Sequence, residues 1–181
     1  HPAKICAVPT DNGIINDYFK CCIQGDLPLT ASSVCINRDL ISEIGGFPLG
    51  MKMGEDQVVW SRLSCRAPIA YDGQTCVYYD QSVISSACHT NSVTQPAPQL
   101  AVYQDMLHER SVPEHLVASL KKLMQFTVLS CVKNNLLVGE RSQAYKLLVG
   151  HASLRWDIYR ILGFCMLLVP SCIFQILNKI R

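Results

Sequence analysis

The feature of this sequence that most constrains its fold is a glycine-rich loop that leads directly into two adjacent carboxylates. Residues 45–60 read GGFPLGMKMGEDQVVW, so four glycines and one proline precede Glu55 and Asp56. Glycine adopts positive φ angles at no steric cost, which allows the loop to turn tightly and to pack close to other backbone. Apolar residues then recur at helical spacing up to Pro68, which cannot continue a helix. The stretch predicts a tight loop followed by a helix that ends near Ala67.

The two carboxylates lie on different faces of this predicted helix. If the helix begins near Gly54, Asp56 shares one stripe with three apolar residues, Val59, Trp60 and Leu63. That stripe should face the body of the protein, so we expect Asp56 to point inward. Glu55 projects about 100° away from it. Acidic residues in a first helical turn also offset the helix dipole and cap free N–H groups, so the pair fits a structural role as well as a functional one.

An ordered set of motifs surrounds the loop. Residues 31–47 read ASSVCINRDLISEIGGF, residues 54–56 read GED and residues 60–63 read WSRL. This order, a small-residue strand, a short helix, an Ile-Gly-Gly-Phe turn and a helix led by Glu-Asp, resembles family 2 glycosyltransferases of the GT-A fold. The resemblance extends more weakly over residues 2–80. It implies an α/β fold, a partial GT-A (Rossmann-like) domain, whose acceptor-side half would occupy residues 1–91.

The resemblance also implies a reaction. Family members of this type transfer a sugar from a nucleotide-sugar donor to a glycan or lipid-linked acceptor with inversion at the anomeric carbon. A base must take a proton from the attacking hydroxyl, and the matching residue here is Asp56, with Glu55 orienting or tuning it. The residues implied on the acceptor side are Thr30, Ser32, Gly46 and Trp60. Two of them have plain alternatives, because Ser32 can simply pack closely and Trp60 lies on a stripe that suits the core.

The donor side of such an enzyme has no counterpart in this chain. The family binds the nucleotide on amino-terminal βα units and holds Mg²⁺ or Mn²⁺ with an Asp-x-Asp sequence, whereas no Asp-x-Asp and no glycine-rich phosphate loop occurs here. Relatives also carry histidine or arginine where Asp80 and Gln81 stand. We therefore expect a piece of a longer enzyme that contains no metal ligands and is inactive alone, with the divalent metal held by residues outside the chain.

Local patterns predict the remaining elements. Strands are expected at residues 4–8, 30–36, 69–71 and 75–79, with a turn at 11–13 and a hairpin around Asp72 and Gly73. Helices are expected at residues 14–23, 38–44, 99–110, 113–134 and 141–151. Residues 92–98, which include two prolines, predict a linker before an all-helical region at 99–181.

The end of the helical region is unusually apolar. Eighteen residues without a charge lie between Arg160 and Lys179, and Arg155 and Arg181 add further cations at the flanks. A helix of that length is about 27 Å long, at the lower limit for spanning a bilayer. Three alternatives remain open for residues 154–181: a buried helix, a helix in the membrane interface, and a short span. We favour a kinked helix, interrupted at Pro170, against the cytoplasmic face of a membrane.

Composition limits the other classes of function. The formal net charge is +2, and no basic stripe interleaved with aromatic residues occurs, so nucleic acid is not an expected partner. Ten cysteines without a C-x-x-C pair are best interpreted as small apolar residues in a reducing compartment, with a secreted disulfide framework as the lesser alternative. The rival to the enzyme is a non-catalytic, membrane-associated helical interaction protein.

Overall fold

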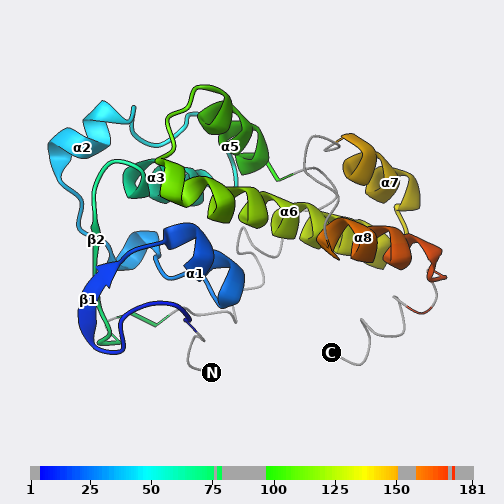
Figure 1. The fold of residues 1–181 in the computed structure, drawn as a ribbon, viewed down its shortest axis with the longest axis horizontal. Helices are drawn as coiled ribbons and strands as arrows, with labels where there is room; N and C mark the ends of the chain where they lie inside the picture. The colour runs from blue at the N-terminus through cyan, green and yellow to red at the C-terminus, as the bar shows by residue number, and fades with distance from the viewer. Residues whose placement is uncertain (1–4, 76, 79–96, 151–157, 171–172, 174–181) are drawn as a thin grey trace.

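A long central helix organises this computed structural model, which describes residues 5–75, 77–78, 97–150, 158–170 and 173 (Figure 1). The central helix is α6 (Glu114–Leu137). Helices α1 (Tyr18–Gln24) and α5 (Gln99–His108) pack near its beginning, and α7 (Arg141–Gly150) and α8 (Ile158–Leu168) pack near its end. The described part is thus a mixed α/β structure that is mostly helical.

The sequence of α6 explains its position. Its buried residues recur at spacings of three and four, which places them on a broad face of the helix. They are Leu116, Leu120, Leu123, Met124, Val128, Cys131, Val132, Asn135 and Leu136. The helix begins directly after Pro113 and ends at Leu137; Val138 is its C-cap, and Gly139 takes φ +87° and lets the chain reverse into α7. A positive φ of this kind favours glycine because the residue has no Cβ.

One carboxylate joins α1 to α6. Asp17 is the N-cap of α1, and its Oδ1 accepts a hydrogen bond of 2.9 Å from the backbone N–H of Lys20. Its other oxygen, Oδ2, accepts a hydrogen bond from the hydroxyl of Ser119 on α6. The apolar side of α1, with Tyr18 and Phe19, is buried. Asp17 therefore fixes both the start of α1 and its position on α6.

Among the described residues the sheet consists of two short antiparallel strands, β1 (Asn12–Ile15) and β2 (Ile69–Asp72). The register pairs Asn12 with Asp72 and Ile15 with Ile69. The strand predicted at residues 69–71 is confirmed. Its partner β1 covers part of the turn predicted at 11–13 and the first two residues of the helix predicted at 14–23, so both of those predictions are wrong there. The predicted hairpin at Asp72 is wrong, because β2 pairs with β1 and residues 75, 77 and 78 are not in a strand; residues 76 and 79 lie outside the described residues.

Two further predicted strands are wrong. Residues 5–8 form no strand, and residue 4 lies outside the described residues. Within residues 30–36 the chain forms the 3₁₀ turn η1 (Ala31–Ser33), in which the hydroxyl of Ser33 lies 3.1 Å from that of Thr30. Local hydrogen bonds of serine and threonine compete with strand pairing, which explains the difference. Val8 and Val34 are partly buried against the core.

The predictions of helices were more accurate than those of strands. Helices α2 (Arg38–Glu43) and α3 (Glu55–Ser64) confirm the two short helices around the glycine loop, and α5, α6 and α7 confirm the helices that follow residue 98. The helix predicted at 14–23 is present from Tyr18 as α1. Most of the predicted linker, residues 92–96, lies outside the described residues.

The apolar tail is described only in part. Helix α8 ends at Leu168, two residues before Pro170, and residues 154–157, 171–172 and 174–181 of the predicted tail lie outside the described residues. None of the helices in the described ranges combines the length and the apolar content that crossing a bilayer requires.

Helices α7 and α8 pack closely at the far end of α6. A Cβ atom added to Gly163 of α8 would lie 2.6 Å from Leu148 of α7, so the glycine permits this approach. The ring of Tyr159 stands edge-on to that of Phe126 on α6, with centroids 6.4 Å apart. Arg141, the first residue of α7, donates hydrogen bonds to the carbonyl oxygens of Leu167 and Val169 at the end of α8.

The double role of Asp17 can be tested by substitution. Asp17→Ala removes the cap of α1 and the bond to Ser119, and we expect the free energy of unfolding to fall by about 2 kcal/mol. Asp105→Ala, which replaces an exposed carboxylate on α5, should change it by less than about 0.5 kcal/mol. Urea denaturation of both variants measures the difference, and equal stabilities would show that Asp17 does not join the two helices.

Candidate functional site

The glycine loop begins as the end of helix α2. The N–H of Gly46 donates to the carbonyl oxygen of Ile41 over 2.9 Å, and Gly45 and Gly46 take φ angles of +81° and +67°. This arrangement is a helix C-cap of the Schellman type, in which left-handed residues let orphan carbonyl groups find partners. The Ile-Gly-Gly-Phe turn is therefore required by the end of α2. At the other end of the loop, Gly54 takes φ +81° as the N-cap of α3.

Two contacts attach this loop to α3. The ring of Phe47 stands edge-on to that of Trp60, with centroids 6.1 Å apart and planes at 84°. The guanidinium of Arg62 donates through Nη1 to the carbonyl oxygen of Ile44 over 3.2 Å. Trp60 is only 2% exposed, so its ring belongs to the core and offers no open face for stacking in this structure. Arg62 serves the end of α2 through this bond.

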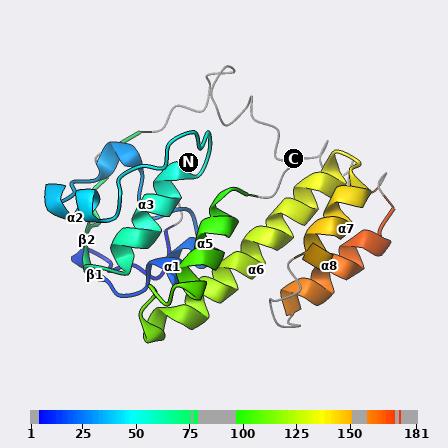
Figure 2. The ribbon, with the colours of Figure 1, turned by 90° about the horizontal axis from the view of Figure 1, so that it is seen from above.

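Helix α3 is held on its other side by α5. Gln99 Nε2 donates to Gln57 Oε1 over 3.3 Å, and the Ser61 hydroxyl donates to the Tyr103 hydroxyl over 3.2 Å. The two bonds lie four residues apart on each helix, so α3 and α5 run side by side in the same direction. A Cβ atom at Gly54 would lie 2.7 Å from Gln99 Oε1, so this glycine also makes room for the contact. Figure 2 shows α3, α5 and α6 in succession.

Asp56 lies at the start of α3, where this packing leaves it half-buried. Its Oδ1 accepts a hydrogen bond of 2.7 Å from the backbone N–H of Gln57. The positive end of the helix dipole stabilises a carboxylate in the first turn. Glu55 is also half-buried. Asp56 is thus held at one end of a fixed helix, with part of its surface open to solvent.

Buried weak acids lie on the interior side of Asp56. Burial raises the pKa of Tyr18 well above its usual value, and the nearby Cys22, Tyr103 and Asp56 raise it further. Burial is also the main cause that raises the pKa of Tyr103 to about 12, with smaller contributions from Cys22 and Asp56. The pKa of Cys22 rises to about 12, again mainly through burial. These groups therefore stay protonated and uncharged at neutral pH.

The structure separates the predicted acceptor-side residues into two groups. Gly46 and Trp60 belong to the loop and helix that meet through Phe47. Thr30 and Ser32 are exposed at η1, and Thr30 bonds within that turn to Ser33. The described contacts thus unite Gly46 and Trp60 with the helix that carries Glu55 and Asp56, and they leave Thr30 and Ser32 on a turn of their own.

Reasoning from the sequence missed three buried polar residues near the candidate site. Tyr18, Ser61 and Tyr103 come from three helices that are far apart in the chain. One signal was present: Tyr103 stands on the apolar face of its helix with Leu100 and Met106, and a phenol at such a position needs a polar neighbour. The identity of that neighbour cannot be read from local spacing.

Metal binding finds no support in this part of the molecule. Within the described ranges, no group of three or more His, Cys, Asp or Glu residues is arranged so that it could hold a metal ion. The carboxylates of Glu55 and Asp56 therefore do not fit a complete metal site among these residues.

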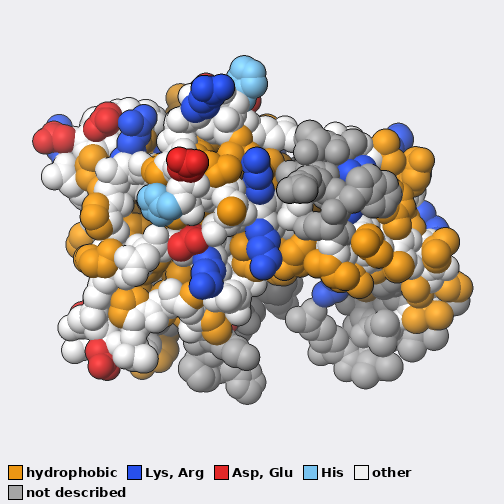
Figure 3. All heavy atoms as spheres, viewed as in Figure 1, with side chains coloured by type: hydrophobic (Ala, Val, Ile, Leu, Met, Phe, Trp, Pro, Cys, Tyr) orange, Lys and Arg blue, Asp and Glu red, His pale blue; other side chains and the backbone are white. Residues whose placement is uncertain are grey.

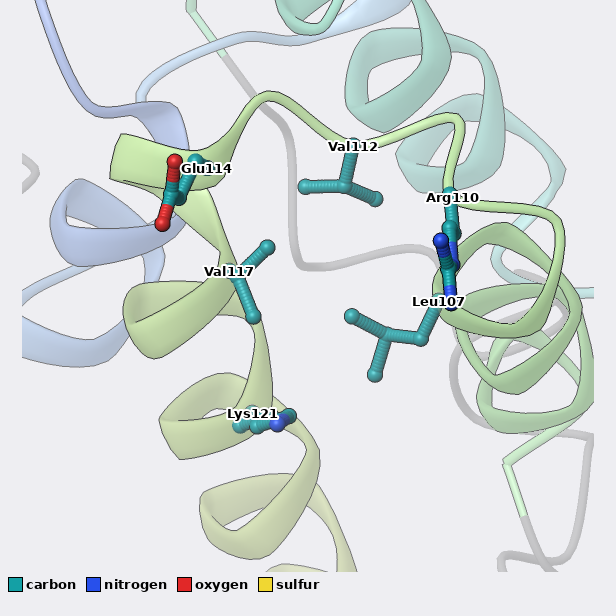
Figure 4. Close-up of a pocket in the computed structure, with 6 residues that line it drawn as sticks. All are labelled: Leu107, Arg110, Val112, Glu114, Val117 and Lys121. Atoms are coloured by element: carbon teal, nitrogen blue, oxygen red, sulfur yellow. The ribbon is translucent and has the colours of Figure 1, made fainter.

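A cavity of about 240 Å³ lies at the opposite end of α5 from Asp56, between α5 and the start of α6 (Figure 4). Its apolar lining consists of Leu107, Val112 and Val117, and its charged lining of Arg110, Glu114 and Lys121. The three charged residues are exposed, so the cavity is a surface hollow. It has no direct connection with the residues around Asp56.

Comparisons with models of protein families, with curated proteins and with solved structures find no match for this chain.

The buried phenol of Tyr103 predicts a loss of stability in alkali. Its pKa is about 12 in the folded protein against 10.0 for a free side chain, so folding favours the protonated form. This contribution is complete below about pH 10 and is lost as the pH rises towards about 12. At about pH 11 the loss is about 1 kcal/mol.

Tyr103→Phe removes this titration. In urea denaturation, the variant should lose about 1 kcal/mol less stability than the parent between about pH 8 and about pH 11. Tyr145→Phe is the matched control, because Tyr145 is 55% exposed on α7, and it should lose as much as the parent. An identical alkaline loss in all three proteins would mean that Tyr103 does not titrate from a buried position.

Proposed function

We propose that this chain is the acceptor-side half of an inverting family 2 glycosyltransferase with a partial GT-A fold, in which Asp56 is the general base. The observation that supports it most is the position of Asp56: a half-buried carboxylate at the beginning of α3, directly after the glycine loop. A base must be held by a rigid element and still be reached by its substrate. The order of the motifs around the loop supports the same function.

The chemistry requires one proton transfer and one displacement. The acceptor hydroxyl oxygen attacks the anomeric carbon of the donor sugar, the bond from that carbon to the nucleoside diphosphate breaks, and the hydroxyl proton passes to Asp56. Oδ1 of Asp56 is engaged with the Gln57 N–H, which leaves Oδ2 to receive the proton. The protonated phenols beneath Asp56 add no competing negative charge there.

The other residues would act around this base. Glu55 would orient or tune Asp56, and Thr30, Ser32 and Gly46 would contact a glycan or lipid-linked acceptor. Trp60 would act through Phe47, by fixing the glycine loop, since its ring is buried. The donor nucleotide-sugar would be held by a half that precedes His1. A divalent metal there would neutralise the departing diphosphate, but the described residues do not form a site for it, so no step is assigned to it.

Asp56→Asn is the direct test, made in the polypeptide that carries the donor-binding half ahead of His1. Asparagine keeps the size and the hydrogen bond to Gln57 but is not a useful base. We expect the rate of sugar transfer to fall on the order of 10²–10⁴-fold with little change in stability. Glu55→Gln, the adjacent carboxylate, should cost much less, because it is not the proposed proton acceptor.

Transfer by Asp56→Asn at close to the parental rate, in a protein of unchanged stability, would remove Asp56 as the base. A coding sequence without a nucleotide-binding half ahead of His1 would remove the enzyme altogether.

The proposal also predicts that residues 1–181 alone neither bind nor turn over a nucleotide-sugar. A nucleoside diphosphate needs cations, backbone donors or a metal to balance its charge, whereas the candidate site presents two carboxylates. Calorimetric titration with several nucleotide-sugars in the presence of Mn²⁺ should show no heat of binding. Micromolar affinity would indicate a complete donor site within this chain.

The second candidate is a non-catalytic, membrane-associated helical interaction protein. It is favoured by the exposed apolar residues of α8, among them Ile158 and Leu168, which a soluble enzyme domain would not need. The two candidates differ in what precedes His1, because only the enzyme requires a nucleotide-binding half there.

A further inference from the structure

Helix α8 presents a stripe of apolar side chains to the outside of the molecule. The stripe follows the helical spacing i, i+3, i+4, i+7 and i+10. We define it by its residues, all of them exposed: Ile158, Ile161, Leu162, Cys165 and Leu168. The exposed fractions reach 61% at Ile158 and 83% at Leu168. A surface helix normally keeps such a face for the core.

The opposite face of α8 already has its partners. Gly163 is buried against Leu148 of α7, and Phe164 and Leu167 pack against the core. Internal packing therefore accounts for one apolar face of α8 and leaves the stripe without a covering element among the described residues. An exposed apolar patch of this kind marks an interaction surface.

Charge is divided unevenly between the two parts of the chain. Residues 111–181 contain nine Lys and Arg but three Asp and Glu, a net charge of +6, whereas residues 1–110 carry a net charge of −4. In Figure 3, hydrophobic side chains gather over α7 and α8 with Lys and Arg among them, and the acidic side chains lie over the remaining elements, where Lys and Arg also occur. Helices α7 and α8 themselves carry Arg141, Lys146 and Arg160 and no acidic residue, so the charge on these two helices is basic.

We propose that the stripe docks onto the surface of an anionic lipid bilayer. Its apolar side chains would enter the boundary between head groups and acyl chains, and the neighbouring cations would lie among the anionic head groups. At 11 residues, α8 is about 16 Å long, which suits a helix that lies on a membrane. A second copy of the chain fits less well, because two surfaces on which α7 and α8 carry only basic charges would repel each other. The inference does not depend on the chemistry proposed for Asp56.

Flotation of residues 1–181 with lipid vesicles tests the proposal. Vesicles of one part phosphatidylserine to two parts phosphatidylcholine should carry the protein upward, and pure phosphatidylcholine should carry much less. Raising the salt concentration should weaken the binding, because it screens the head groups. Absence of binding to the anionic vesicles would overturn the proposal.

Substitutions locate the surface. The double variant Ile161→Asn and Leu162→Asn should reduce partitioning into the anionic vesicles by about tenfold or more, because two apolar side chains are lost from the interface. Leu49→Asn is the matched control, since Leu49 is fully exposed on the glycine loop, and it should float like the parent. Equal flotation of the double variant would exclude the stripe.

A substitute variant and two further measurements distinguish a membrane from the other possible partners of the stripe. If the double variant does not fold, as judged by circular dichroism, Lys146→Glu takes its place: it reverses an exposed charge on α7 and should also weaken flotation, and unchanged flotation would contradict the proposal. In sedimentation without lipid the parent should be monomeric. A dimer that the double variant abolishes would assign the stripe to a second copy. Flotation only after removal of residues 171–181 would assign it to the chain's own tail.

Discussion

The structure depends on the burial of α6. The apolar face of this helix is too broad to be buried by a single neighbouring helix. Helices α1 and α5 bury its beginning, and α7 and α8 bury its end. The two-stranded sheet is too small to provide a core of its own. Packing of helices on α6 therefore supplies most of the apolar contact that offsets the entropy of ordering the chain.

The helix that carries the candidate site is attached to α6 through other helices. Helix α3 is held by α1 and α5, and both of these pack on α6. The direction of Asp56 thus depends on a layer of contacts that includes the bonds from Gln99 to Gln57 and from Ser61 to Tyr103. All four of these side chains are polar. Apolar replacements would still allow the helices to pack but would no longer fix their register.

Elements with local signals could be predicted from the sequence, and elements without them could not. Asn37 caps α2 and Gly45 and Gly46 end it, so its bounds follow from neighbouring residues. The pairing of β1 with β2 joins distant segments, and no residue near position 12 reveals its partner. The same holds at the candidate site, where spacing placed Asp56 on its helix but could not reveal the phenols of Tyr18 and Tyr103, because other helices supply them.

The position of Arg141 destabilises the start of one helix and stabilises the end of another. As the first residue of α7 it adds positive charge to the positive end of its own helix dipole, which weakens the start of α7. The same guanidinium lies at the carboxyl end of α8, where a cation and hydrogen-bond donors are favourable. The cost to α7 is thus offset only when α8 is in place. The two helices should form and open as one cooperative unit, so that hydrogen exchange in α7 reports on the attachment of α8.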